Sequence, residues 1–152
     1  LQGDQVVYLD KFEAHQSLRM HSQIGRSAPV YCTGVGKAIL SGLSEEEFEL
    51  LAKTLTFESF TENTITSVDG LRADRAASIA RGYAIDAEEH ETGIRCAAAA
   101  IKTSAGGLLG GISVTAPAYR VSDEIYEQWT LWVQKIAADI GSDADIKMGP
   151  RK

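Results

Sequence analysis

The residues with the clearest potential for chemistry form the stretch Thr33-Gly34-Val35-Gly36-Lys37. Thr33 is a suitable N-cap, so the pattern predicts a helix that begins at Gly34. The first backbone N–H groups of a helix have no acceptor within the helix, and together with the helix dipole they attract anions. Because glycines leave these groups uncovered, the stretch predicts the floor of a small-anion pocket. An equally good alternative is that the glycines only allow another backbone to pack closely.

The same stretch does not fit the common nucleotide-binding motifs. A dinucleotide-binding motif would need glycine at the position of Ile39. A P-loop ending in Gly36-Lys37 would need glycine in place of Tyr31 and a serine or threonine in place of Ala38. We therefore expect no nucleotide at this helix.

Polar residues near predicted strands are further candidates. Asp86 ends the apolar run 83–85 and is predicted to point inward, where a carboxylate needs hydroxyl or amide partners. Ser113 and Thr115 lie two residues apart and therefore on one strand face. The alternatives are a solvated acidic loop around Asp86 and ordinary cross-strand pairing of the hydroxyls.

The cysteines raise a second functional hypothesis. Cys32 lies close to the predicted helix N-terminus, which lowers the pKa of a thiol and favours a nucleophile. The alternative function is therefore a small thiol-dependent hydrolase that uses Cys32 or Cys96. Buried, inert cysteine is the commoner case. The cysteines and histidines show no zinc-site spacing, so we expect neither a metal nor a cofactor.

Capping signals delimit the helices that would position these groups. The expected helices follow the N-caps Thr33, Ser44, Ser67 and Ser122. The first, third and fourth are expected to end near Gly42, Arg81 and Gly141, and the second has a predicted buried stripe of Phe48, Leu51 and Leu55. Ser44 and Glu47 have the spacing of a capping box. The last helix carries a predicted buried stripe of Ile125, Trp129, Trp132, Val133, Ile136, Ala137 and Ile140.

The strands are expected at residues 6–9, 17–21 and 83–86, with a hairpin of 94–102 and 107–116. A register that pairs Lys102 with Gly107 places Cys96 opposite Ser113. One hairpin face, predicted to be a pocket wall, then carries Cys96, Ala98, Ala100, Leu109, Gly111, Ser113 and Thr115. The other face, predicted to be core, carries Ile101, Leu108, Ile112 and Val114. A slip of one residue would exchange the two faces.

Length and composition indicate one compact domain. The chain has 152 residues, of which 44% are apolar and 24% are charged. A formal net charge of -6 argues against nucleic-acid binding by this chain itself. Neither a signal peptide nor an apolar run of membrane-spanning length is present. The small number of cysteines favours a reducing cytoplasm. Leu1 is not an initiator methionine, so we expect a fragment or a processed form.

Taken together, these motifs resemble a known family. The series runs Arg26, Pro29, 33–38, Gly82-Tyr83, Asp86, Glu88-Glu89, 93–96 and 113–117. It is similar to the C-terminal effector-binding domain of the IclR family of bacterial transcription regulators, over residues 6–141. The resemblance implies an α+β, GAF-like fold in which a single antiparallel sheet is flanked by helices. The alanine run after Cys96, and Thr115-Ala116 where the family commonly has Ser and Gly, depart from its pattern.

The resemblance also implies a site and partners. Residues 1–141 would form the effector-binding domain and residues 142–152 a polar C-terminal tail, with the family's N-terminal winged helix-turn-helix absent from this chain. A small carboxylate metabolite, such as a sugar-derived acid or keto acid, would be the effector of a repressor. DNA would be contacted only through the absent domain, no membrane would be involved, and the protein would be a homodimer or homotetramer. The implied ligand-binding residues are Met20, Gly34, Val35, Asp86, Cys96, Ser113 and Thr115.

Overall fold

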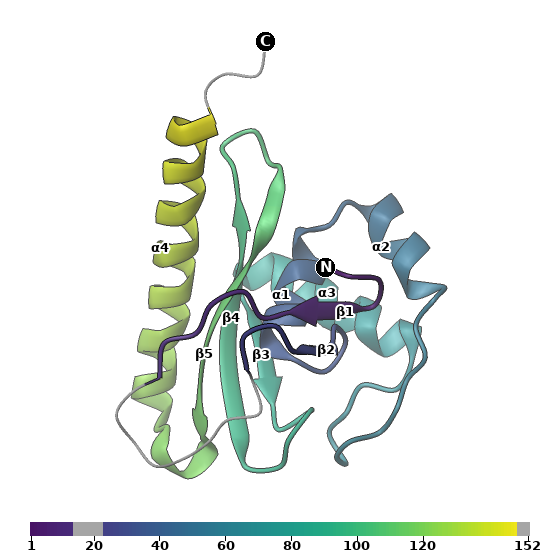
Figure 1. Ribbon diagram of the computed structural model, residues 1–152. Helices are drawn as coiled ribbons and strands as arrows, with labels where there is room; N and C mark the ends of the chain where they lie inside the picture. The colour runs from purple at the N-terminus through teal and green to yellow at the C-terminus, as the bar shows by residue number, and fades with distance from the viewer. Residues whose placement is uncertain (14–22, 149–152) are drawn as a thin grey trace.

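The computed structural model describes residues 1–13 and 23–148 (Figure 1). The strands are β1 (Gln5–Val7), β2 (Ser27–Pro29), β3 (Ala84–Ala87), β4 (Ile94–Lys102) and β5 (Leu108–Pro117). The helices are α1 (Gly34–Gly42), α2 (Glu45–Ala52), α3 (Val68–Arg81), the short 3-10 helix η1 (Ala118–Arg120) and α4 (Asp123–Met148). The predicted strand at residues 17–21 lies outside the described residues.

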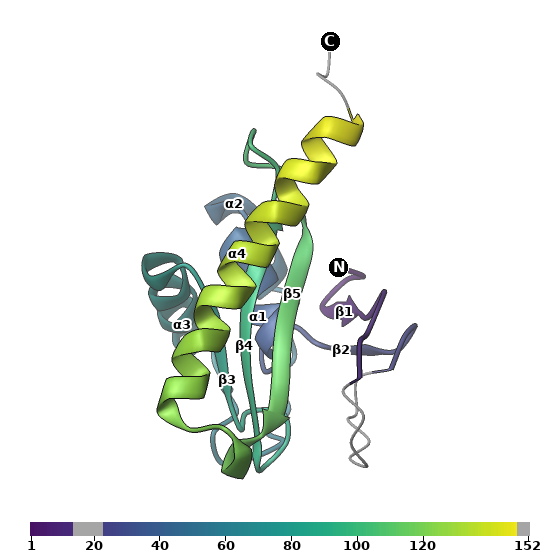
Figure 2. The same ribbon diagram turned by 90° about the vertical axis from the view of Figure 1, so that its left-hand side faces the viewer.

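A three-stranded antiparallel sheet in the order β3-β4-β5 forms the middle layer. Helix α4 covers one face of this sheet, and α1 and α3 lie on the other (Figures 1 and 2). Strands β1 and β2 pair separately as a small antiparallel sheet beside α1. The predicted α+β class, with an antiparallel sheet flanked by helices, is confirmed. The small second sheet adds to the single sheet that we expected.

The hairpin register differs from the predicted one by two residues over most of its length. Cys96 lies opposite Thr115 and Ala98 opposite Ser113, with an irregularity between Ile101 and Lys102. Because the shift is even, Cys96, Ser113 and Thr115 still share one face. Leu108 is the exception. It lies beyond the irregularity and packs on the α1 side with the first core cluster, so its predicted place on the other face is wrong.

The alanine run of β4 follows from the layers on both of its faces. Ala97 and Ala99 pack under α4 with Tyr126, Trp129 and Val133. On the opposite face Ala98 packs against Ala38 of α1 and Ala84 of β3. Small side chains on both faces let two helices approach the central strand closely. The departure from the family pattern is therefore a packing feature of this chain.

The predicted N-caps position the helices as expected. The Thr33 hydroxyl accepts from the Gly36 amide, and the Ser67 hydroxyl accepts from the Gly70 amide. Ser44 and Glu47 form both hydrogen bonds of a capping box. Helix α2 ends at Ala52, so Leu55 of its predicted stripe follows the helix, where it still packs against the first core cluster. These caps satisfy backbone donors that would otherwise have no partner at the helix starts.

The predicted end of the last helix at Gly141 is wrong, because α4 continues to Met148. Gly141 is buried where α4 passes the β4–β5 hairpin, and a Cβ atom there would collide with the Lys102 carbonyl. Gly141 therefore provides close approach rather than helix termination. The polar residues after it continue the helix instead of forming an irregular tail over 142–148.

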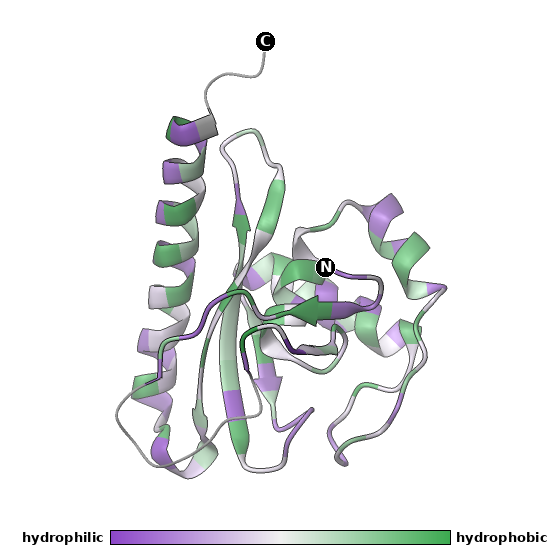
Figure 3. Cartoon of the chain, in the orientation of Figure 1, coloured by the Kyte–Doolittle hydropathy of each residue, from purple (hydrophilic) through white to green (hydrophobic). Residues whose placement is uncertain are grey.

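The predicted buried stripe of α4 is correct on one side only. Figure 3 shows apolar residues recurring along the helix. Those that face the sheet are Tyr126, Trp129, Val133 and Ala137, whereas Ile125, Trp132, Ile136 and Ile140 are exposed. Trp129 is 8% exposed and Trp132 is 53% exposed, so only the first belongs to the core. Among the described helices, none is long and apolar enough to cross a membrane.

Candidate functional site

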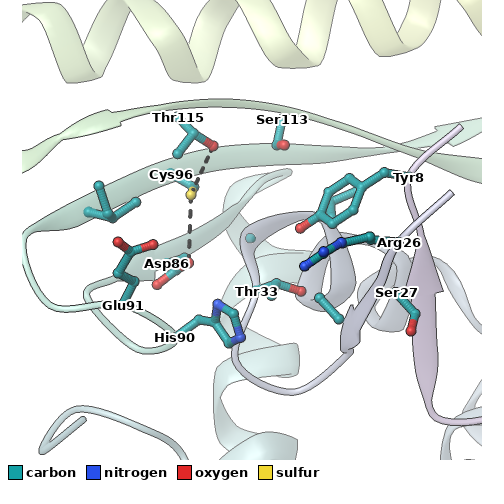
Figure 4. Close-up of a pocket in the computed structure, with 14 residues that line it drawn as sticks. Tyr8, Arg26, Ser27, Thr33, Asp86, His90, Glu91, Cys96, Ser113 and Thr115 are labelled. Carbon is teal, nitrogen blue, oxygen red and sulfur yellow. Dashed lines mark hydrogen bonds between the residues drawn. The ribbon is translucent and has the colours of Figure 1, made fainter. Parts of the chain in front are cut away.

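A cavity of about 170 Å³ lies between the start of α1, the β1–β2 pair and one end of the three-stranded sheet (Figure 4). A cavity of this size suits a small acid better than a nucleotide. The cavity is lined by Tyr8, Arg26, Ser27, Ala28, Thr33, Gly34, Val35, Asp86, His90, Glu91, Ile94, Cys96, Ser113 and Thr115.

The structure brings together every predicted site residue that it describes. Gly34, Val35, Asp86, Cys96, Ser113 and Thr115 all line this one cavity. They come from α1, β3, β4 and β5, so only the tertiary fold makes them neighbours. Met20 lies outside the described residues. Ligand binding by any of these residues stays a prediction.

The first turn of α1 forms the floor of the cavity. The Val35 amide has no hydrogen-bond acceptor among the described residues, and the Gly34 amide faces the Cys96 sulfur. A Cβ atom on Gly34 would lie 2.8 Å from the Cβ of Cys96, so this glycine is needed for α1 to approach β4. The close-packing interpretation of the glycine stretch is therefore confirmed. The stretch also lies at a cavity, and anion binding there stays a prediction.

Asp86, Cys96 and Thr115 form a connected wall on the sheet side (Figure 4). The Thr115 hydroxyl donates to the Cys96 sulfur at 3.0 Å, and the thiol donates to Asp86 Oδ2 at 3.6 Å. The other carboxylate oxygen, Oδ1, accepts from the Glu89 amide at 2.9 Å. Burial raises the pKa of the Asp86 carboxyl, while that amide and the Lys37 ammonium act in the opposite direction.

A buried charge cluster supports this wall from behind. The Lys37 side chain is only 1% exposed, and its Nζ lies 2.5 Å from Glu89 Oε1 and 3.3 Å from Asp74 Oδ1. It therefore ties α1 to α3 and to the loop after β3. Burial raises the pKa of the Glu89 carboxyl, although Lys37 opposes the shift. Glu89 is thus not part of a solvated acidic loop, which was the alternative for this segment.

The cysteines do not have the environment of a catalytic thiol. Cys32 is fully buried, and burial raises its pKa to about 12. Burial and the nearby Asp86 carboxylate also raise the pKa of Cys96. A protonated thiol is a poor nucleophile. Among the described residues no group of Cys, His, Asp and Glu side chains could hold a metal ion.

Sequence reasoning missed several lining residues, above all Tyr8 and Arg26. Arg26 belongs to the series that carries the family resemblance but is not among the predicted site residues, and Tyr8 is predicted only as part of a strand. Pairing of β1 with β2 brings them to the cavity, because Val6 lies opposite Ala28 in that pair. Their proximity in space to Asp86, which follows far along the chain, could not be read from local spacing.

Comparison with known proteins identifies this arrangement. A profile of the family described as "Bacterial transcriptional regulator IclR C-terminal" matches residues 1–142. The chain belongs to the IclR family. Members of this family, including the relatives described next, are transcriptional regulators and not enzymes, so the thiol-hydrolase hypothesis is not supported.

The curated relatives cover nearly the whole chain. It is 37% identical over 152 residues to the HTH-type transcriptional regulator BhcR of Paracoccus denitrificans, covering 100% of this chain and 53% of BhcR. It is 32% identical over 145 residues to KdgR of Escherichia coli, covering 93% and 55%. It is 29% identical over 148 residues to the E. coli transcriptional repressor AllR, covering 97% and 55%. The chain thus spans about half the length of these IclR relatives.

Solved structures agree with the fold. The Thermotoga maritima IclR structure superposes with a TM-score of 0.85 at 32% identity, over 93% of this chain and 59% of that one. A Rhodococcus sp. RHA1 protein, titled a putative transcriptional regulator, gives a TM-score of 0.88 at 30% identity, over 95% and 59%. Because IclR C-terminal domains have a GAF-like fold, the predicted GAF-like class is confirmed.

Proposed function

We propose that this chain is the effector-binding domain of a DNA-binding transcription regulator, and that its cavity takes a small carboxylate metabolite. The observation that carries the proposal is the convergence of helix N-terminal amides, strand hydroxyls and a buried carboxylate on one small cavity. Oriented amides and hydroxyls recognise a carboxylate, and a carboxylate recognises ligand hydroxyl groups. The regulator class of the relatives supports the same function.

Within this proposal each lining group has a defined role. The ligand carboxylate accepts from the Gly34 and Val35 amides and from the hydroxyls of Ser113 and Thr115. Asp86 accepts from a hydroxyl of the ligand. Cys96 contributes to the wall, and Met20 is assigned by the family resemblance alone. This pattern suits a sugar-derived acid or a keto acid.

The regulatory step follows from linkage. An effector that binds one conformer of the domain better shifts the population toward it, and thereby changes DNA affinity of a winged helix-turn-helix domain in the whole protein. We propose repression as the basal state, since one relative, AllR, is named a repressor. We also propose a cytoplasmic homodimer or homotetramer.

The first experiment is a thermal-shift screen of this chain against about fifty small organic acids, because a ligand at ~100 times its Kd stabilises the folded state by about 2.7 kcal/mol. A screen in which no acid stabilises the chain contradicts the proposal.

The second experiment tests the assigned roles by calorimetric titration with glycerate, which has hydroxyl groups, and pyruvate, which has none. Asp86→Ala should weaken glycerate and leave pyruvate unchanged or tighter, because a nearby carboxylate repels the ligand anion. The matched control Ser113→Ala should weaken both acids. Equal losses for both acids in Asp86→Ala would show that Asp86 only maintains the shape of the cavity.

A further inference from the structure

Arg26 lines the cavity, but the proposed function above assigns it no contact with the ligand. Of the described residues that line the cavity, Arg26 is the one that is an arginine or a lysine. Figure 4 shows it extending into the cavity beside Tyr8 and above Thr33. None of the ion pairs between described residues involves Arg26. Its guanidinium is therefore available to a ligand.

The backbone fixes Arg26 and Tyr8 as a pair. The Tyr8 amide donates to the Arg26 carbonyl at 3.1 Å, and the Gly25 amide donates to the Tyr8 carbonyl at 2.8 Å. These bonds extend the β1–β2 ladder to the edge of the cavity. Tyr8 is partly buried, and burial together with Cys96 and Asp86 raises its pKa to about 12. Its hydroxyl therefore remains a proton donor at neutral pH.

The charges around the cavity indicate a role for Arg26 and Tyr8. Asp86 lines the same space, and the whole chain carries a net charge of -6. An entering anion is repelled by negative charge of this kind, so a cation on the cavity wall favours its binding. Figure 4 shows Arg26 and Tyr8 entering from the side opposite Asp86 and Cys96. The donors of this side are thus separate from the wall that Asp86 forms.

We propose that Arg26 and Tyr8 form a second anion subsite, so that the preferred effector is a small acid with two anionic groups. One carboxylate lies on the α1 amides, and the second group, a carboxylate or a phosphate, accepts from the Arg26 guanidinium and the Tyr8 hydroxyl. The planar guanidinium suits two-pronged hydrogen bonding to either group. This inference rests on the proposed function and specifies the class of its ligand.

Two matched ligand pairs test the subsite by calorimetry on the 152-residue chain. Malate is lactate with a second carboxylate, and 3-phosphoglycerate is glycerate with a phosphate. We expect the doubly anionic member of at least one pair to bind about tenfold or more tightly than its partner, as for hydrogen bonds to a charged group. The pair with the larger gain distinguishes a carboxylate from a phosphate subsite.

Variants of Arg26 and Tyr8 test whether these residues bind the second anionic group of the ligand rather than its first carboxylate. Arg26→Gln should remove about a tenfold gain for the doubly anionic acid and change its singly anionic partner by less than about twofold. Arg26→Lys keeps the positive charge but loses the planar guanidinium and its two-pronged hydrogen bonding. It should therefore retain part of the gain in affinity. Tyr8→Phe should reduce it by a smaller factor, because one neutral donor is lost.

Several outcomes would overturn the subsite. Equal losses for both members of a pair in Arg26→Gln would place Arg26 on the shared carboxylate, and no loss for either would place it outside the site. If the screen above finds an acid but neither pair shows a gain from the second anionic group, the subsite fails and the proposed function stands. If no acid binds at all, both fail.

Discussion

Asp86 shows how one residue links the cavity to the core. Asp86 is only 4% exposed, and its carboxylate accepts hydrogen bonds from the Glu89 amide and the Cys96 thiol. Glu89 in turn binds the buried ammonium of Lys37. Asp86 is therefore linked through Glu89 to the ion pair that connects α1 with the loop after β3. Such buried groups are costly to ionise, which is the reason for the raised pKa of Asp86.

The raised pKa of Asp86 predicts a pH-dependent effect of Asp86→Asn. The folded state holds this proton more tightly than the unfolded chain, whose pKa is near the ordinary value of 3.8. The wild-type contribution to stability is therefore fully present below that value and is lost as pH rises through the folded pKa. Asn cannot ionise, yet it can still accept from the Glu89 amide.

The free energy of unfolding of Asp86→Asn, relative to wild type, should thus increase as pH rises above about 4. Urea unfolding at a series of pH values measures this difference. A difference that stays constant with pH, or that decreases as pH rises, would show that the Asp86 pKa is not raised.

At the scale of elements, α4 provides the backing of the sheet while the site lies on the sheet's other face. Its inner face buries Trp129 against Ala97 and Ala99 of β4, and the Tyr126 hydroxyl donates to the Cys96 carbonyl at 2.9 Å. The helix thereby holds the strand from which Cys96 reaches the cavity. Its outer apolar residues are exposed in this chain, so the two tryptophans should differ sharply in their contributions.

Trp129→Ala should lower the free energy of unfolding by ~3–5 kcal/mol, because it removes a buried aromatic side chain. Trp132→Ala, three residues away on the same helix, should change it by less than about 1 kcal/mol. Chemical denaturation of the two variants makes the comparison. A large loss for Trp132→Ala that grows with protein concentration would mean that another copy of the chain covers the outer face of α4.

At the scale of the whole molecule, charge argues against direct contact with DNA. The chain carries a formal net charge of -6, whereas proteins that grip the phosphate backbone need a concentration of basic side chains. In the function proposed above, DNA contact belongs to a separate winged helix-turn-helix domain.

The isolated chain should accordingly fail to shift duplex DNA in an electrophoretic or fluorescence-anisotropy assay at micromolar concentration and low salt. Addition of an acid that stabilises the chain should not change this result. Salt-sensitive binding of DNA by the chain alone would contradict the proposal that DNA is contacted only by a separate domain.

The sequence by itself determined the elements whose signals are local. Caps at Thr33, Ser44 and Ser67 fixed three helix starts because a cap acts through the nearest amides. Alternation in the β4–β5 hairpin placed Cys96, Ser113 and Thr115 on one face, since that face depends only on parity. The wider grouping of site residues, including the assignment of Gly34 and Asp86 to one pocket, came with the family resemblance.

Tertiary structure alone decided the features that depend on a distant partner. The local sequence predicts that Gly141 ends the helix, whereas the structure places Gly141 against the Lys102 carbonyl. Trp129 and Trp132 are equally apolar, and only the position of the sheet makes one buried and the other exposed. Arg26 reaches the cavity because β1 pairs with β2. Lys37 is buried because Glu89 and Asp74, far along the chain, neutralise it. Local periodicity carries no information about such contacts, because they form only when separate elements pack together.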